Sequence, residues 1–243
     1  KKKSITLLAT TKNFTADSKV VTIDGSATGA SEIIGNKKKN YIIAGSNGST
    51  LNGGKGNDTL VGGTGADVFV YENKSGKDVI VNYSVGDKIN LNGVKIKDAK
   101  TKGNNSVIKF SSGSLTITDT KDKTIILTLN DKETIFKNGI LTTEDTLKVY
   151  GSYKGAIDLT EYNAKNIDAS FAKKKLTING NIENNLLVGG KGNDMSRRNQ
   201  IGMMNSQKSK GFDDLLDLTE GSVKFKGFPR GADALKITKR LNI

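Results

Sequence analysis

The stretch "GGKGNDTLVGGTGADVFVY", residues 53–71, repeats itself with a period of nine residues. Five positions return in the second copy: Gly53 as Gly62, Gly54 as Gly63, Gly56 as Gly65, Asp58 as Asp67 and Leu60 as Phe69. A period of nine fits neither the 3.6-residue period of a helix nor the two-residue period of a strand. It predicts a solenoid, in which short strands and glycine-rich turns alternate and successive units stack.

The apolar residue of the repeat recurs well beyond these two copies. With Gly53 as position one, an apolar side chain occupies position eight of successive units at Ile33, Ile42, Leu51, Leu60, Phe69, Ile80 and Ile89, after allowance for a two-residue insertion at Tyr71 and Glu72. One unit cannot bury such a side chain alone, so the units must stack. We expect this ladder to run from about Ser26 to Asn90.

Composition excludes several classes of protein. The chain has 28 Gly but no Cys and no His, which excludes disulfides, thiolate zinc sites and Ser–His–Asp catalysis. Its 35% hydrophobic and 6% aromatic residues favour a thin core spread along a repeat fold. The net charge of +13 comes from scattered lysines without interleaved aromatics, which argues against specific nucleic-acid binding. No apolar run reaches the roughly 18 residues of a membrane span.

The units "GGKGNDTLV" and "GGTGADVFV" resemble the RTX (hemolysin-type) calcium-binding nonapeptide repeats, G-G-x-G-x-D-x-U-x. The segment "GKDVIVNYSVGDKINL" that follows is similar to the end of such arrays. The resemblance implies a parallel β-roll, calcium ions in the turns and a bacterial protein that is secreted or displayed at the cell surface. Calcium prefers six to eight oxygen ligands, which glycine-turn carbonyls and one aspartate per turn can supply.

In a β-roll two nonapeptides make one coil, so alternate turns stack on the same edge. We therefore expect Asp58 beside Asp78 and Asp67 beside Asp87, each pair giving two carboxylates to one ion. The predicted calcium ligands come from Gly53, Gly54, Gly56, Asp58, Gly62, Gly63, Gly65, Asp67, Asp78 and Asp87.

The earlier turns carry no carboxylate at position six, which is Ser31, Asn40 and Ser49. We expect them to bind calcium weakly or not at all. For the acidic turns the alternative is that the glycines serve turn geometry alone and the aspartates only cap the turns.

A longer repeat overlies the short one, because "GGKGND" at 53–58 returns at 189–194, with Ile178 and Leu187 as a second ladder. After Asp194 the register fails, since Ser196 takes the apolar position, and every Arg, Met and Pro of the chain follows. We expect an all-β chain: a parallel β-roll solenoid, adjoining antiparallel β-hairpins and an irregular C-terminal tail. The expected segments are N-terminal strands of the first module (1–25), the RTX-like roll (26–91), antiparallel hairpins (92–145), the start of a second, truncated module (146–194) and an atypical tail, with disorder as an alternative (195–243).

The sequence favours a non-enzymatic calcium-binding module of a secreted or cell-surface bacterial protein, whose folding is coupled to calcium binding. Its expected partners are calcium ions and other modules of the same parent chain. Two alternatives stay open. The chain could be a repeat fragment of a secreted enzyme or toxin, or a lysine-rich module that binds an acidic polymer.

Overall fold

The structure is a computed structural model that describes residues 1–29, 31–91, 93–151, 153–181, 185–191, 194–197 and 216–217. The chain forms two compact units. Unit 1 comprises Lys1–Glu144 and Lys148–Tyr153, and unit 2 comprises Asp145–Leu147 and Lys154–Ile243. β17 (Thr146–Gly151) contains the passage from one unit to the other.

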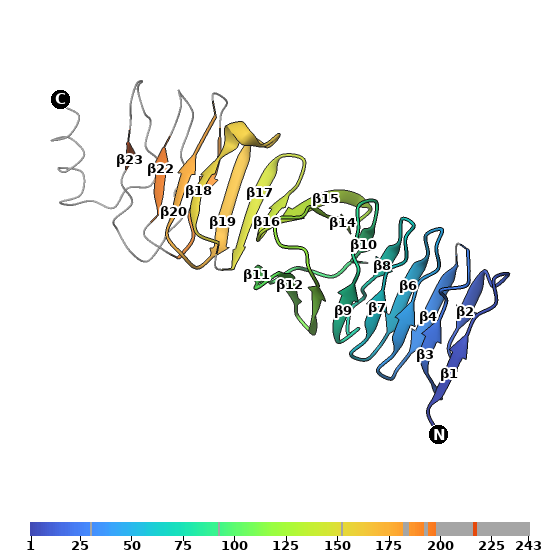
Figure 1. The fold of residues 1–243 in the computed structure, drawn as a ribbon. Coiled ribbons are helices and arrows are strands. Elements are labelled where there is room, and N and C mark those ends of the chain that lie inside the picture. The colour runs from blue at the N-terminus through green and yellow to red at the C-terminus, as the bar shows by residue number, and fades with distance from the viewer. Residues whose placement is uncertain are drawn as a thin grey trace, which may run out of the picture. The chain divides into compact units, whose positions relative to one another are not determined.

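Unit 1 is a roll of two sheets, and successive strands of the repeat alternate between them (Figure 1). The first sheet has the order β1 (Lys3–Thr6), β3 (Val20–Asp24), β5 (Tyr41–Ile43), β7 (Thr59–Val61), β9 (Lys77–Val81), β13 (Gly113–Ile117), β12 (Asn105–Phe110) and β11 (Asp98–Lys102). The second has the order β2 (Asn13–Thr15), β4 (Glu32–Asn36), β6 (Thr50–Gly54), β8 (Val68–Val70), β10 (Lys88–Asn90), β14 (Ile125–Leu129), β15 (Lys132–Lys137) and β16 (Ile140–Thr142). The strands from β1 to β10 pair in parallel within their sheets.

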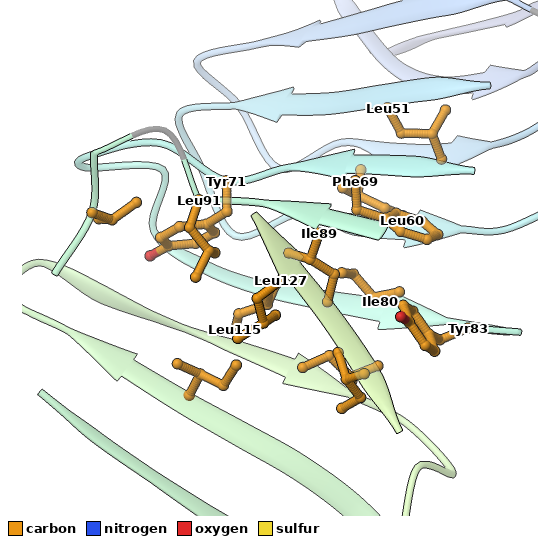
Figure 2. Close-up of a cluster of buried hydrophobic side chains, with 14 of the residues drawn as sticks. Leu51, Leu60, Phe69, Tyr71, Ile80, Tyr83, Ile89, Leu91, Leu115 and Leu127 are labelled. Atoms are coloured by element: carbon orange, nitrogen blue, oxygen red, sulfur yellow. The ribbon is translucent and has the colours of Figure 1, made fainter. Parts of the chain in front are cut away.

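The core of the roll is the predicted apolar ladder. In one sheet Ile42 pairs with Leu60 and Leu60 with Ile80. In the other, the pairing runs from Ile33 through Leu51, Phe69 and Ile89. All seven ladder side chains are at most 2% exposed and belong to one hydrophobic cluster. Figure 2 shows Leu51, Leu60, Phe69, Ile80 and Ile89 between the strands. The nine-residue register is therefore confirmed.

The ladder extends further in both directions than the sequence indicated. Ile23 pairs with Ile42 and Phe14 with Ile33, so β2 and β3 already belong to the roll. At the other end, Ile117 pairs with Ile80 and Leu127 with Ile89. β13 and β14 thus continue the parallel roll in their sheets, and the antiparallel strands lie beyond them in the sheet order.

The predicted antiparallel hairpins are confirmed. β13 pairs antiparallel with β12 and β12 with β11, while β14, β15 and β16 form a second antiparallel set. Asn138 and Gly139 join β15 to β16 with φ of 51° and 91°, the backbone that a two-residue Asn-Gly turn requires. Main-chain pairing therefore joins the hairpins to the roll.

Unit 2 repeats the opening of the roll. β18 (Gly155–Asp158), β20 (Leu176–Asn179), β22 (Met195–Arg197) and β23 (Leu216–Asp217) form one parallel sheet. β19 (Asn166–Ala172) pairs in parallel with β21 (Leu187–Val188), and a 3₁₀ turn, η1 (Leu159–Glu161), follows β18. The predicted ladder residues Ile178 and Leu187 are buried here.

The apolar pattern stops directly after Asp194, as the sequence indicated, but strand pairing continues past it. β22 pairs with β20 and places Ser196 opposite Ile178, and β23 pairs with β22. Strand pairing uses main-chain groups that every residue supplies, so pairing can outlast the apolar pattern. The rest of the expected tail lies outside the described residues. No helix in the described part of the chain has the length and apolarity to cross a bilayer.

Replacing Leu60 by Ala should lower the free energy of unfolding by about 2–4 kcal/mol, because the vacated space lies in a thin, fully buried stack. Urea unfolding followed by far-UV circular dichroism in calcium would measure it. Leu8→Ala is the control, since Leu8 is 74% exposed and should change stability by less than about 0.5 kcal/mol. Equal effects of both changes would contradict the ladder.

Candidate metal centre

The four acidic side chains of the repeat lie on the two edges of the roll, where the chain passes between the sheets. Asp58 precedes β7 and Asp78 lies in β9, so both belong to one edge. Asp67 precedes β8 and Asp87 precedes β10 on the other edge. All four are at most 3% exposed.

Main-chain hydrogen bonds bring the predicted pairs together. The N–H of Asp58 donates to Asp78 Oδ1 at 2.8 Å, and the N–H of Asp67 donates to Asp87 Oδ1 at 2.8 Å. The carboxylates of Asp78 and Asp87 thus lie on the backbone of their partners in the preceding coil. The structure therefore places Asp58 beside Asp78 and Asp67 beside Asp87. That each pair holds an ion stays a prediction.

The same bond continues one coil earlier on both edges. The N–H of Asn40 donates to Asp58 Oδ1, and the N–H of Ser49 donates to Asp67 Oδ1, both at 2.7 Å. In unit 2 the N–H of Leu176 donates to Asp194 Oδ1 at 2.9 Å. Each position-six aspartate thus accepts a main-chain N–H from the preceding coil.

The two acidic turns differ in the second carboxylate oxygen. Asp67 Oδ2 accepts the N–H of Gly63 at 2.7 Å, within its own turn. In the preceding repeat the N–H of Gly54 instead donates to Asn52 Oδ1 at 2.9 Å. Asp58 Oδ2 is left buried without a hydrogen-bond partner. This turn therefore lacks a hydrogen-bond donor or a cation for Asp58 Oδ2. Leaving a buried carboxylate oxygen unpaired is costly.

Two of the predicted glycines shape the space beside Asp58. Gly56 has φ of 144°, and a Cβ placed on it would lie 2.6 Å from the carbonyl oxygen of Lys38 and 2.9 Å from Asp58 Oδ1. A Cβ on Gly53 would lie 2.4 Å from Asp58 Oδ2. The absence of a Cβ on Gly56 leaves Asp58 Oδ1 and the carbonyl oxygen of Lys38 facing one small space, and its absence on Gly53 leaves room beside Asp58 Oδ2.

On the other edge, close backbone approach explains the three glycines of the repeat. A Cβ on Gly63 would lie 1.8 Å from the carbonyl oxygen of Gly45, and one on Gly65 would lie 2.1 Å from the nitrogen of Gly48. One on Gly62 would lie 2.8 Å from the carbonyl oxygen of Asn82.

Sequence reasoning missed the part that asparagines play. Asn82, with φ of 61°, donates its amide to the carbonyl oxygens of Gly62 at 2.8 Å and Gly63 at 3.2 Å. These are carbonyls that we predicted as calcium ligands. The signal was a turn asparagine located 20 residues after Gly62, which was passed over because carboxylates were the only side chains considered.

Burial dominates the electrostatics of the acidic turns. It raises the pKa of Asp58 to about 7, against the effect of the Asn40 N–H, and the charge of Asp78 adds to the rise. Burial also raises the pKa of Asp78 to about 6. The pKa of Asp67 is raised by burial too, although the N–H groups of Gly63 and Ser49 oppose the shift.

The donor set around Asp58 fits a hard divalent cation. Such an ion binds carboxylate and carbonyl oxygens and would neutralise the two buried acids. Within the described residues no three acidic, His or Cys side chains converge as a metal site. The ligands would therefore be the carboxylates of Asp58 and Asp78 with main-chain oxygens such as that of Lys38.

Two sheets of parallel strands with buried aspartates in glycine-rich turns define the class of this protein as a β-roll. The model of the RTX calcium-binding nonapeptide repeat family matches the chain in four copies, over residues 34–69 and 177–195. The matched residues lie in both units, and the family is the one that the sequence resembles. No curated protein matches the chain.

In EDTA, unit 1 should lose stability as the pH rises from about 4 to about 7. The folded pKa of Asp58 lies above the value of about 3.9 for an unfolded chain. Its contribution is thus complete below pH 4 and is lost as the folded carboxyl ionises. Urea unfolding at several pH values would measure this trend.

Asp24→Asn is the control for this pH dependence. The pKa of Asp24 is lowered by hydrogen bonds from Ser26, so its ionisation occurs below the pH window. This variant should keep the wild-type slope between pH 4 and 7. Stability in EDTA that rises with pH through this window would contradict the assignment.

Proposed function

We propose that this chain is a non-enzymatic calcium-binding module of a secreted or cell-surface bacterial RTX-like protein. The observation that supports it most is the buried pair of Asp58 and Asp78, with Asp58 Oδ2 lacking any hydrogen-bond partner. A calcium ion would supply the missing positive charge. Gly53 and Gly56 leave the space in which the oxygens meet.

The positions of the buried acidic residues also support ions that stabilise the turns. The buried acidic residues of the described chain are Asp58, Asp67, Asp78, Asp87 and Asp194. Each occupies position six of a repeat. They are therefore spread along the edges of the roll, one to a turn, as turn-stabilising ions would require.

In the proposed mechanism, calcium binding and folding are one equilibrium. Without calcium, the roll must bury two carboxylates that repel each other and lose their water, which favours the open chain. With calcium, binding to the folded state alone shifts the equilibrium toward the closed roll. A site with two carboxylates and otherwise neutral ligands suits the affinities of extracellular modules, about 10⁻⁴–10⁻³ M. The module would thus fold after export, in a calcium-rich medium.

Asp58→Ala should weaken calcium binding more than Asp24→Ala does, because Asp58 supplies a buried carboxylate of the proposed site. Asp24 lies at the end of β3 and accepts the N–H of Ser26 at 3.0 Å. Isothermal titration calorimetry of calcium into the wild type and both variants would test this. No binding heat up to tens of millimolar calcium, or equal affinities in all three, would mean that the glycine turns are purely structural.

The lysine-rich alternative is supported by one exposed cluster, Lys37–Lys39, in the turn between β4 and β5. Binding of an acidic polymer through it would weaken with salt and persist in EDTA. Calcium-dependent closure predicts the opposite pattern, a response to EDTA with little response to moderate salt.

A further inference from the structure

Position six of the repeat is not always acidic, and three of the other side chains there, Asn40, Asn185 and Ser31, share one contact. Asn40 Nδ2 donates to the carbonyl oxygen of Val20 at 3.1 Å, and Asn185 Nδ2 donates to that of Lys165 at 2.9 Å. Ser31 Oγ donates to the carbonyl oxygen of Thr11 at 2.7 Å. In all three the acceptor lies 20 residues earlier, one coil back on the same edge.

The two asparagines also reproduce the accepting role of the aspartates. Asn40 Oδ1 accepts the N–H of Asn36 at 2.8 Å, and Asn185 Oδ1 accepts that of Asn181 at 2.9 Å. This is the bond that Asp67 Oδ2 makes with Gly63. An asparagine therefore binds its own turn with its oxygen and the preceding coil with its nitrogen.

At Asp58 the corresponding contact has no donor. The residue 20 positions earlier is Lys38, whose carbonyl oxygen faces the space beside Gly56 together with Asp58 Oδ1. An ionised carboxylate has no proton to donate, and Asp58 Oδ2 is already unpartnered. At Asp58, therefore, two acceptor oxygens face one another. In the Asn40 turn, an amide N–H group makes the corresponding contact.

We propose that the position-six side chain decides whether a turn closes by its own hydrogen bond or requires calcium. The amides of Asn40 and Asn185 and the hydroxyl of Ser31 occupy the role of the cation, so these turns close without metal. This inference rests on the proposed calcium function of the aspartate turns. Ser49 is outside the group, because its Oγ accepts the N–H of Gly45.

The consequence is a roll whose beginning is independent of calcium. The coils from β2 to β5 are joined through Ser31 and Asn40, before the first acidic turn at Asp58. They present a formed edge on which the calcium-dependent turns can stack. Unit 2 has the same order, with Asn185 before Asp194.

Exchanging the two residue types in the full-length chain tests the proposal. In EDTA, Asn40→Asp should lower hydrogen-exchange protection of residues 36–43 by about tenfold or more, since the amide donor is replaced by a buried acceptor. Calcium should restore that protection, and calorimetry should show one additional bound ion. Asp58→Asn should do the reverse, with higher protection of residues 54–61 in EDTA and one ion fewer.

Two controls separate the donor from other effects. Asn40→Ala removes the donor without adding charge, so its lost protection should not return with calcium. Asn13→Asp adds the same charge at an exposed position of β2 and should leave protection and stoichiometry unchanged. Unchanged protection in Asn40→Asp without calcium, or a loss that calcium fails to reverse, would overturn the proposal.

These experiments distinguish failure of this proposal from failure of the proposed calcium function. If the wild type binds no calcium, the calcium function fails. The EDTA measurements on Asp58→Asn and Asn40→Ala still decide the donor rule, since both compare hydrogen bonding without metal. Unaltered protection in Asp58→Asn in EDTA would overturn the rule even if the wild type binds calcium.

Discussion

Each coil of this roll carries a polar side chain at position six into a buried edge, and the rest of the structure depends on how that side chain is paired. The carboxylates of Asp58, Asp78 and Asp87 each accept a main-chain N–H from the coil before them. These bonds hold the strands at the spacing at which the ladder side chains meet. Because a buried acceptor without a partner is costly, any oxygen in excess must find a donor or a cation. The edges therefore couple the polar chemistry of the turns to the packing between the sheets.

The core that these edges enclose is thin, so the stability of the roll depends strongly on how the turns at its edges close. Each coil contributes only one or two inward side chains, such as Leu51 and Leu60, so apolar burial per residue is small. A solenoid of this kind is stabilised by contacts between neighbouring coils rather than by a single large core. Turn closure then decides whether two coils remain in contact. That is a physical reason for calcium, or for an amide in its place, to control folding here.

The sequence predicted the parts of the fold that follow from strict spacing. Ile33 to Ile89 were found because nine-residue spacing places them on one inner surface. Ile117 and Leu127 were missed, because the strands and loops between β10 and β14 break that spacing while strand pairing preserves the stack. The pairing of Asp58 with Asp78 followed from alternate stacking. The difference between the Asp58 turn and the Asp67 turn could not be predicted from spacing. It arises because the N–H of Gly54 donates to Asn52 instead of to Asp58. The donor role of Asn40 was also missed, since carboxylates were the only side chains considered in the turns.

The two-residue insertion at Tyr71 and Glu72 joins the acidic turns to the hairpins. The Tyr71 ring is buried and stacks on Phe110 at 4.5 Å, and its hydroxyl donates to the carbonyl oxygen of Gly76 at 2.8 Å. Gly76 precedes Asp78, and its own carbonyl also accepts the N–H of Ser114 at the start of β13. One carbonyl thus connects the turn of the proposed ion to the ring stack and the first hairpin. A change in how Asp78 is paired must therefore reach the hairpin end of the roll, which makes the insertion a coupling element between metal turn and hairpin.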